Sequence, residues 1–169
     1  VIHRPQKLGI GTAYKEAFQK FLNDYDFFIE MDADFSHNPK ILPIFLEEIK
    51  NQDLVIGSRY RKGGKMAIPS LWRCLVSRIG CLYARLVTGV NINDLTAGYI
   101  CYSQKALKSI NFNQINSGGY AFQIEMKYLL AKQGCKIKEI PIVFTERESG
   151  KSKFFLGLIL EAIWRCWKL

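Results

Sequence analysis

The sequence predicts an α/β protein whose helices pack in layers against a largely parallel sheet. Amphipathic helical patterns alternate along the chain with short apolar runs that are typical of buried strands. The length of 169 residues is that of one ordinary domain with a single hydrophobic core. A composition of 49% hydrophobic and 23% charged residues excludes a disordered or low-complexity protein.

The first part of the chain is expected to fold as helix, strand, helix and strand. Apolar side chains follow one helical stripe over residues 12–22, and the apolar run at 27–31 predicts a strand. Asn38-Pro39 suits a helix start, because proline is well tolerated in the first helical turn. Residues 54–56 are then expected to form a short buried strand.

The second part of the chain begins with a strongly basic segment. Every charged side chain between Arg59 and Asn93 is basic, and residues 70–87 follow an amphipathic helical pattern. A glycine-rich loop at 61–65 precedes that helix. The other elements expected are a strand near 99–102, a helix near 121–132, a strand at 137–144, a loop at 145–152 and a last helix from Lys153.

The charge balance limits the classes of partner. With 24 Lys and Arg against 15 Asp and Glu, the net charge of +9 favours phosphates, acidic lipid headgroups or nucleic acid. We expect no nucleic-acid partner, because the sequence has no helix-turn-helix, zinc-finger or RNP-like motif. The basic amphipathic helix instead favours peripheral contact with an anionic membrane surface.

Cysteine spacing and hydropathy indicate the cellular environment of the protein. The five cysteines form no C-x-x-C pair, so neither a zinc site nor a disulfide framework is indicated, and a reducing cytosolic setting is expected. No uncharged apolar run approaches the roughly 20 residues of a membrane-spanning helix. The first residues resemble neither a signal peptide nor a usual start, and we expect upstream sequence to be missing.

The sharpest local feature is the acidic pair Asp32 and Asp34 at the end of the first predicted strand. Side chains two apart in an extended segment point the same way, about 6 to 7 Å apart, so the pair suits one Mg²⁺ or Mn²⁺ ion. Ligands bind at the carboxyl ends of strands in α/β sheets, which favours a site here. The alternative is that both aspartates serve as turn and cap residues.

The second candidate is a phosphate-binding site. Arg73 and Ser77 are spaced i and i+4 on one helix face, and Arg59 from the preceding strand end would join them around a single phosphate. The alternative is a basic helix that is simply solvated. Near the N-terminus, Lys7 and the glycines before the first helix suit either a tight turn or a phosphate contact.

Three further candidates are weaker on local grounds. The basic segment from Arg147 to Lys153 suits a lid that closes on a polyanion, or an ordinary exposed loop. Asp94, Gln123 and Glu125 lie in apolar surroundings, where each would be either functional or a buried structural residue.

Five motifs, taken together and in this order, resemble those of the dolichol-phosphate mannose synthase family. Members of that family are family 2 glycosyltransferases. The motifs are Glu30 to His37, Gly57 to Tyr60, Asp94 to Tyr99, Gln123 to Met126, and Arg147 to Lys153. The resemblance runs from about residue 1 to residue 167. It implies a GT-A type, Rossmann-like three-layer fold with a mixed, mainly parallel sheet that is incomplete at the N-terminus.

The same resemblance implies transfer of mannose from GDP-mannose to the phosphate of a dolichyl or undecaprenyl lipid, with inversion and a divalent metal. UDP-glucose as donor, or a non-catalytic membrane-binding module, are the alternatives. The implied roles are metal binding by Asp32 and Asp34; donor binding by Lys7, Asp32, Asp94, Gln123 and Glu125; acceptor-phosphate binding by Arg59, Arg73 and Ser77; and catalysis by Asp34, Arg147 and Lys153. Asp94, Gln123 and Glu125 would orient donor hydroxyls or basic partners.

Two departures from the family qualify this expectation. Family members often carry glutamine where this chain has Ser36, and the family's opening β-α-β portion, which grips the nucleotide, has no counterpart in this sequence. We therefore expect residues 1–169 to be part of one catalytic domain, with a partner subunit as one source of that portion. Residues 153–169 are expected to form an amphipathic helix that holds the protein at the cytoplasmic face of a membrane.

Overall fold

The computed structural model describes residues 1–68, 70–146 and 156–169, and side chains of the last segment from residue 162. Its main sheet has four strands in the order β1-β4-β2-β5. β2 pairs with β5 in parallel and with β4 antiparallel, and β1 also pairs antiparallel with β4. The strands are β1 (Phe27–Glu30), β2 (Leu54–Ser58), β4 (Ile100–Ser103) and β5 (Ile137–Pro141). Three of these four strands therefore run in one direction, which confirms the mixed, mostly parallel sheet.

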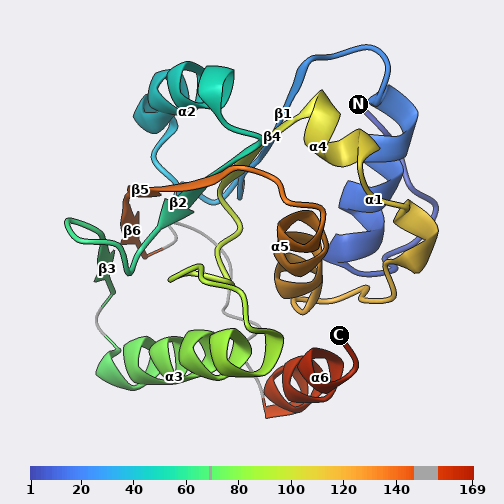
Figure 1. The fold of residues 1–169 in the computed structure, drawn as a ribbon. Helices are drawn as coiled ribbons and strands as arrows, with labels where there is room; N and C mark the ends of the chain where they lie inside the picture. Colours follow the sequence, from blue (N-terminus) through green and yellow to red (C-terminus); the bar gives the residue numbers. More distant parts are fainter. Residues whose placement is uncertain (69, 147–155) are drawn as a thin grey trace.

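Helices cover both faces of this sheet (Figure 1). The helices are α1 (Ile10–Phe21), α2 (Leu42–Glu48), α3 (Leu71–Thr88), α4 (Gln104–Lys108), α5 (Phe122–Lys132) and α6 (Leu156–Trp167). Short 3-10 turns, Pro39–Ile41 and Ile49–Asn51, flank α2. The long predicted helices are confirmed, and α4 was not foreseen.

Two apolar clusters hold the three layers together. Leu54 and Ile56 on β2 pack with Phe18 of α1 and Phe122 of α5, whereas Val55 faces the α2 side. This alternation follows from the two-residue period of a strand, which sends successive side chains to opposite faces. The sheet is thus the middle layer, with α2 on one face and with α1 and α5 on the other (Figure 1).

The region predicted as one strand over 137–144 contains two strands. After β5 the chain forms β6 (Val143–Thr145), which pairs in parallel with β3 (Lys65–Ala67) as a separate two-stranded sheet. The backbone of Ile142 between them donates a hydrogen bond to the carbonyl of Ser58 at 3.1 Å. The small sheet therefore extends from the carboxyl end of β2, beside the predicted phosphate site.

α3 and α6 pack against each other at one end of the molecule (Figure 1). The Tyr83 hydroxyl donates to the carbonyl of Ile163 at 3.3 Å. α3 begins at Ser70, whose side chain accepts from the Arg73 amide, and ends at Gly89 in the left-handed conformation that glycine favours. Among the described residues, no helix is both long enough and apolar enough to cross a membrane.

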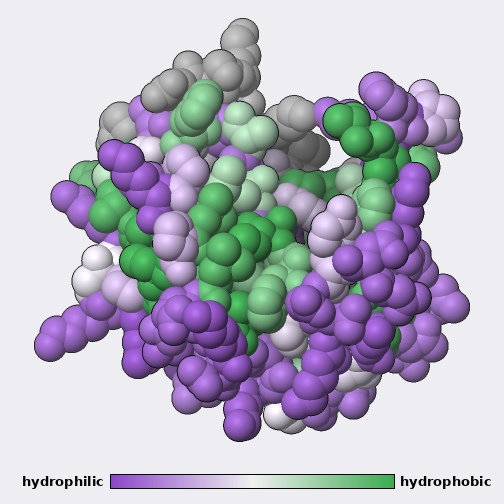
Figure 2. Space-filling view, turned by 90° about the horizontal axis from the view of Figure 1, so that it is seen from above, coloured by the Kyte–Doolittle hydropathy of each residue, from purple (hydrophilic) through white to green (hydrophobic). Residues whose placement is uncertain are grey.

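β1 is an edge strand of the main sheet, and two of its side chains, Phe27 and Ile29, are 41% and 37% exposed. Figure 2 looks down on the molecule from the top of Figure 1 and shows apolar side chains gathered in the middle of that face, between more hydrophilic surfaces. Because β1 lies at the edge of the sheet, one row of its backbone donors and acceptors is available for pairing.

Candidate active site

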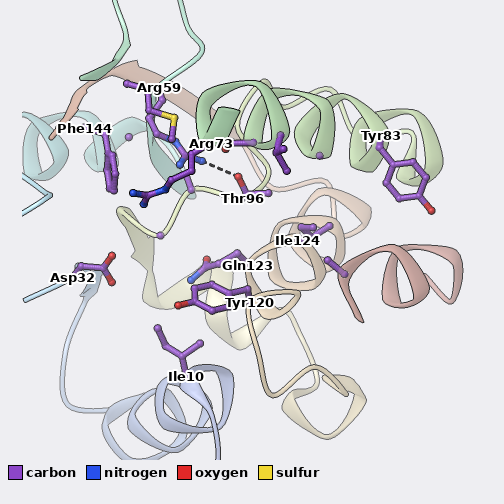
Figure 3. A pocket seen from close by; sticks show the side chains of 18 of the residues that line it. Ile10, Asp32, Arg59, Arg73, Tyr83, Thr96, Tyr120, Gln123, Ile124 and Phe144 are labelled. Atoms are coloured by element: carbon purple, nitrogen blue, oxygen red, sulfur yellow. Dashed lines mark hydrogen bonds between the residues drawn. The ribbon is translucent and has the colours of Figure 1, made fainter. Parts of the chain in front are cut away.

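A cavity of about 290 Å³ lies where the carboxyl ends of the strands meet α3 and the start of α5. Its walls come from segments far apart in the sequence (Figure 3). Asp32 follows β1, Arg59 follows β2, and Arg73 and Ser77 lie on α3. Five of the predicted site residues line this one cavity: Asp32, Arg59, Arg73, Ser77 and Gln123. The strand-end positions explain why Asp32 and Arg59 converge, because parallel strands deliver their carboxyl ends to the same edge of the sheet.

The acidic loop after β1 is braced from within. Asp34 accepts hydrogen bonds through Oδ1 from the Ser36 amide at 3.1 Å and from the Ser36 hydroxyl at 2.5 Å. Phe35 between them has a φ of 62°, the left-handed region that non-glycine residues rarely adopt. Ser36 is buried, and its two hydrogen bonds orient the Asp34 carboxylate.

His37 supports the other aspartate and was not singled out from the sequence. Its Nδ1 accepts from the Asp32 amide at 3.1 Å, and its ring stacks on Tyr99 with centroids 4.7 Å apart. Burial, followed by the nearby charge of Arg59, lowers the pKa of His37 to about 4. The imidazole is therefore neutral near pH 7, with its proton on Nε2. Only its place at the end of the motif from Glu30 to His37 could have drawn attention to it.

The donor chemistry of this loop fits a divalent cation. Mg²⁺ is bound in proteins by one or two carboxylates together with substrate phosphates and water. Asp32 and Asp34 supply two carboxylates, and Asp32 lines the cavity. Over residues 1–68, 70–146 and 156–169, no cluster of three or more histidine, cysteine or acidic side chains could hold a metal. The remaining ligands would have to come from substrate and water.

Arg59 is fixed by a two-point contact with Asp94. The Arg59 Nε and Nη2 atoms donate to the two carboxylate oxygens of Asp94, each at 2.7 Å. Nη2 also donates to Thr96 at 2.8 Å (Figure 3). Burial alone would raise the pKa of Asp94, but the Arg59 guanidinium outweighs it and lowers that pKa. The structure therefore shows Asp94 orienting a basic partner, one of the two roles expected for it. Donor binding by Asp94 itself stays a prediction.

Arg73 and Ser77 face the same space from α3. Arg73 makes a long ion pair with Glu146, 4.0 Å between Nη1 and Oε1, and Ser77 accepts a hydrogen bond from the Tyr60 hydroxyl at 2.6 Å. Figure 3 shows the Arg59 and Arg73 side chains directed into one region, with Asp32 and Gln123 on other sides of it. The three predicted phosphate-binding residues are thus brought together.

A buried polar network lies beneath the cavity, and most of its members could not be recognised from the sequence. Glu30 accepts from the Tyr102 hydroxyl at 3.0 Å and from the Gln123 amide. Lys127 donates to the carbonyls of Leu95 and Ala97 at 3.0 and 2.7 Å. Burial raises the pKa of Glu30 and lowers the pKa of Lys127. The network holds Gln123 at the cavity wall and fixes the loop that carries Ala97.

Two residues predicted to bind the donor, Glu125 and Lys7, do not line the cavity. Glu125 is buried outside the cavity lining, and its two oxygens accept from the amides of Asn116 and Ser117 at 3.0 and 2.8 Å. Its carboxylate braces the loop before α5, and donor binding by Glu125 stays a prediction. Lys7 is exposed and does not line the cavity. Arg147 and Lys153 lie outside the described residues, so their predicted roles stay predictions.

Solved structures share this fold. Glucosyl-3-phosphoglycerate synthase from Mycobacterium tuberculosis, solved with Mn²⁺ and UDP-glucose, matches with a TM-score of 0.63 and 18% identity over 100% of this chain and 57% of that chain. A second structure, described as a mycobacterial protein, matches with a TM-score of 0.64 and 19% identity over 98% of this chain and 51% of that one. At such identities the likeness shows the GT-A fold alone.

Sequence comparison is more specific. The chain is 45% identical over 96% of its length to undecaprenyl-phosphate mannosyltransferase of Micrococcus luteus, and 40% identical over 98% to polyprenol monophosphomannose synthase of Mycolicibacterium smegmatis. It spans 68% and 63% of those two proteins. The pattern described as "Glycosyl transferase family 2" matches residues 1–110. The chain therefore belongs to glycosyl transferase family 2.

Proposed function

We propose that this chain transfers a sugar from a nucleotide-sugar donor to the phosphate of a polyprenyl lipid, and that the sugar is mannose from GDP-mannose. The observation that carries the proposal is the convergence of Asp32 with Arg59, Arg73 and Ser77 on one cavity. An acidic residue suited to a metal thus lies opposite groups suited to a phosphate monoester. The two similar bacterial proteins, a mannosyltransferase and a phosphomannose synthase by name, support the choice of acceptor and sugar.

The acceptor needs little chemical activation. A phosphate monoester has a second pKa near 6, so it is already largely dianionic at neutral pH and attacks without a dedicated base. Arg73 would supply most of the charge neutralisation, and the rigid pairing of Arg59 with Asp94 at 2.7 Å fixes the Arg59 donors, so that little reorganisation is needed. The protein's contribution is then positioning plus charge neutralisation. Attack opposite the leaving diphosphate would invert the anomeric carbon.

Asp32 and Asp34 would hold a divalent metal, and Ser36 and His37 keep these two residues in place. When bound, Mg²⁺ or Mn²⁺ would supply Lewis-acid stabilisation of the departing nucleoside diphosphate. Gln123, on the same cavity, would contact a donor hydroxyl.

The proposed acceptor also requires contact with a membrane, because its tail stays in lipid. Exposed apolar side chains recur along α3 at a spacing that follows the helical period: Leu71, Trp72, Leu75, Ile79, Leu82 and Leu86, each 50% to 83% exposed. Trp164 and Trp167 on α6, which packs against α3, are 59% and 72% exposed. Basic side chains on α3, Arg78 and Arg85, and Lys168 directly after α6 would face lipid headgroups. These side chains support the proposal of contact with a membrane, and we propose that the face contacted is the cytoplasmic one.

The transfer is tested by mass spectrometry of lipid after incubation with undecaprenyl phosphate, Mg²⁺ and either GDP-mannose or UDP-glucose. We expect mannosylated lipid from GDP-mannose, loss of product on chelation with EDTA, and loss in Asp34→Asn. Asp24→Asn, an exposed aspartate after α1, serves as the matched control and should retain activity. If glucosylated lipid is the only product, the transferred sugar is glucose and not mannose. Absence of product from a cooperatively folded chain, with lipid binding retained, would favour a membrane-binding module.

Membrane contact is tested by flotation with phosphatidylcholine vesicles, with and without phosphatidylglycerol. Leu86→Glu, on the exposed face of α3, should weaken binding to the anionic vesicles. Leu46→Glu places the same charge on α2, at the opposite side of the sheet, where Leu46 is 44% exposed. Equal binding by the two variants would argue against α3 as the contact surface.

A further inference from the structure

Tyr60 lies just behind the cavity and was not part of any predicted site, although it belongs to the motif that ends β2. Its position is set by the turn after this strand. The buried Ser58 hydroxyl accepts from the amides of Tyr60 and Arg61, at 3.3 and 3.2 Å. The Tyr60 ring is flanked by two guanidinium groups, with the Arg59 and Arg78 carbons 5.2 and 5.6 Å from its centroid. The ring is therefore held on several sides.

The Tyr60 hydroxyl donates to Ser77 Oγ at 2.6 Å. Over the described part of the chain, Ser77 Oγ makes no hydrogen bond as a donor, so its own proton is uncommitted. A helical serine usually has the option of donating to the carbonyl four residues back. The contact from Tyr60 instead fills one of its acceptor positions from outside the helix, and Ser77 lines the cavity.

The direction of this hydrogen bond matters for an anionic ligand. Phosphate oxygens at neutral pH only accept hydrogen bonds, so a useful serine beside them must donate. A hydroxyl that already accepts a hydrogen bond is also polarised as a donor, because linked hydrogen bonds strengthen one another. Burial raises the pKa of Tyr60, so its phenol keeps the proton that it donates to Ser77.

We infer that Tyr60 is a positioning residue of the phosphate site: it holds the Ser77 hydroxyl so that Ser77 donates its proton to a phosphate monoester in the cavity. The inference rests on the proposed function, because it assumes that the phosphate of the acceptor binds beside Arg59, Arg73 and Ser77. It assigns to a residue outside the cavity a measurable share of the affinity for phosphate.

The test is calorimetric titration of the chain with farnesyl monophosphate in nonionic detergent micelles, and with farnesol as the same tail without phosphate. The variants are Tyr60→Phe, Ser77→Ala and the double substitution. We expect Ser77→Ala to weaken farnesyl phosphate binding about tenfold or more, since it removes a hydrogen bond to a charged group. Tyr60→Phe removes a neutral hydrogen bond one step away and should cost about fivefold.

Two readouts separate positioning from a general structural effect. In the Ser77→Ala background, Tyr60→Phe should have no further effect, because the hydroxyl through which it acts is gone. Farnesol binding and the melting temperature should be unchanged in Tyr60→Phe, whereas a distorted site would alter them. Tyr128→Phe is the matched control: the Tyr128 hydroxyl donates to the Leu169 carbonyl at 2.5 Å, and Tyr128 does not line the cavity.

Each remaining outcome overturns a stated part of the reasoning. Wild-type affinity in Tyr60→Phe, or an equal loss in the presence and absence of Ser77, refutes the role of Tyr60 while the proposed function stands. A loss in Tyr60→Phe without a loss in Ser77→Ala refutes it as well. If the unaltered chain binds farnesyl phosphate no more tightly than farnesol, the phosphate site of the proposed function is refuted, and the inference about Tyr60 fails with it.

Discussion

The stability of this protein should depend on pH through two buried groups whose pKa values move in opposite directions. Burial, and then Arg59, lowers the pKa of His37 from 6.5 to about 4. Burial raises the pKa of Glu30 above its ordinary value of 4.5. Between pH 4.5 and 6.5, unfolded His37 binds a proton that the folded protein excludes, whereas folded Glu30 retains a proton that the unfolded chain releases. The stabilising contribution of His37 is therefore lost as pH falls, and that of Glu30 is lost as pH rises.

The size of each effect follows from linkage. With pKa values of 6.5 unfolded and about 4 folded, His37 should lower the free energy of unfolding by about 2 kcal/mol as pH falls from 6.5 to 4.5. Glu30 opposes this with a slope of up to about 1.4 kcal/mol per pH unit. The lowered pKa values of Asp53 and Asp94 make them titrate below pH 3.8, outside this window. The stability of the unaltered protein should therefore change little between pH 4.5 and 6.5.

Urea unfolding at several pH values tests this cancellation. His37→Asn keeps an acceptor for the Asp32 amide but cannot titrate, and its stability should fall as pH rises from 4.5 to 6.5. Glu30→Gln should show the reverse, with a loss of about 2 kcal/mol as pH falls over the same range. His3→Asn, at an exposed histidine, is the control and should follow the unaltered protein. An identical pH slope in His37→Asn and the unaltered protein would refute the displaced pKa of His37.

Two further predictions concern packing and charge. Asp94→Asn leaves the Arg59 guanidinium largely buried without its charge partner, and should cost about 3 to 5 kcal/mol in urea unfolding; a loss below 1 kcal/mol would contradict the pairing. Gly11→Ala places a Cβ 2.6 Å from the Ser117 carbonyl oxygen and should destabilise by about 1 to 3 kcal/mol, whereas Gly80→Ala, with no neighbour within 4 Å of the added Cβ and inside α3, should stabilise by up to about 1 kcal/mol. Thermal unfolding compares the two variants, and a similar shift of the melting temperature in both would show that the close contact at Gly11 does not destabilise the protein.

The elements most accessible to sequence reasoning were those with a clear period. The helical stripe over 12–22 and the apolar runs at 27–31 and 54–56 are confirmed as α1, β1 and β2. α4 is five residues long and gives too short a pattern for a period to be recognised. The antiparallel direction of β4 was equally hidden, since a strand pattern carries no information about the direction of its neighbour.

The candidate site likewise contains some residues that could be predicted from the sequence and others that could not. Residues at strand ends, such as Asp32 and Arg59, could be predicted because topology alone brings strand ends together. Partners far apart in the chain could not: Asp94 lies 35 positions from Arg59, and Glu30 lies 93 positions from Gln123. Lys127 is the extreme case, because its position within α5 suggests a solvated lysine until its three carbonyl acceptors are known.

These pairings decide which charge a bound phosphate would meet. The Asp94 carboxylate compensates the charge of Arg59 through two contacts of 2.7 Å. Arg59 therefore offers a fixed hydrogen-bond donor with little net charge. Arg73 has only a long contact with the exposed Glu146, 4.0 Å away, and its charge is less compensated. We therefore expect Arg59 and Ser77 to set the geometry of a bound phosphate, and Arg73 to supply most of the attraction. Loss of Arg73 should therefore weaken phosphate binding without unfolding the site, whereas loss of Arg59 also leaves Asp94 as an unpaired buried charge.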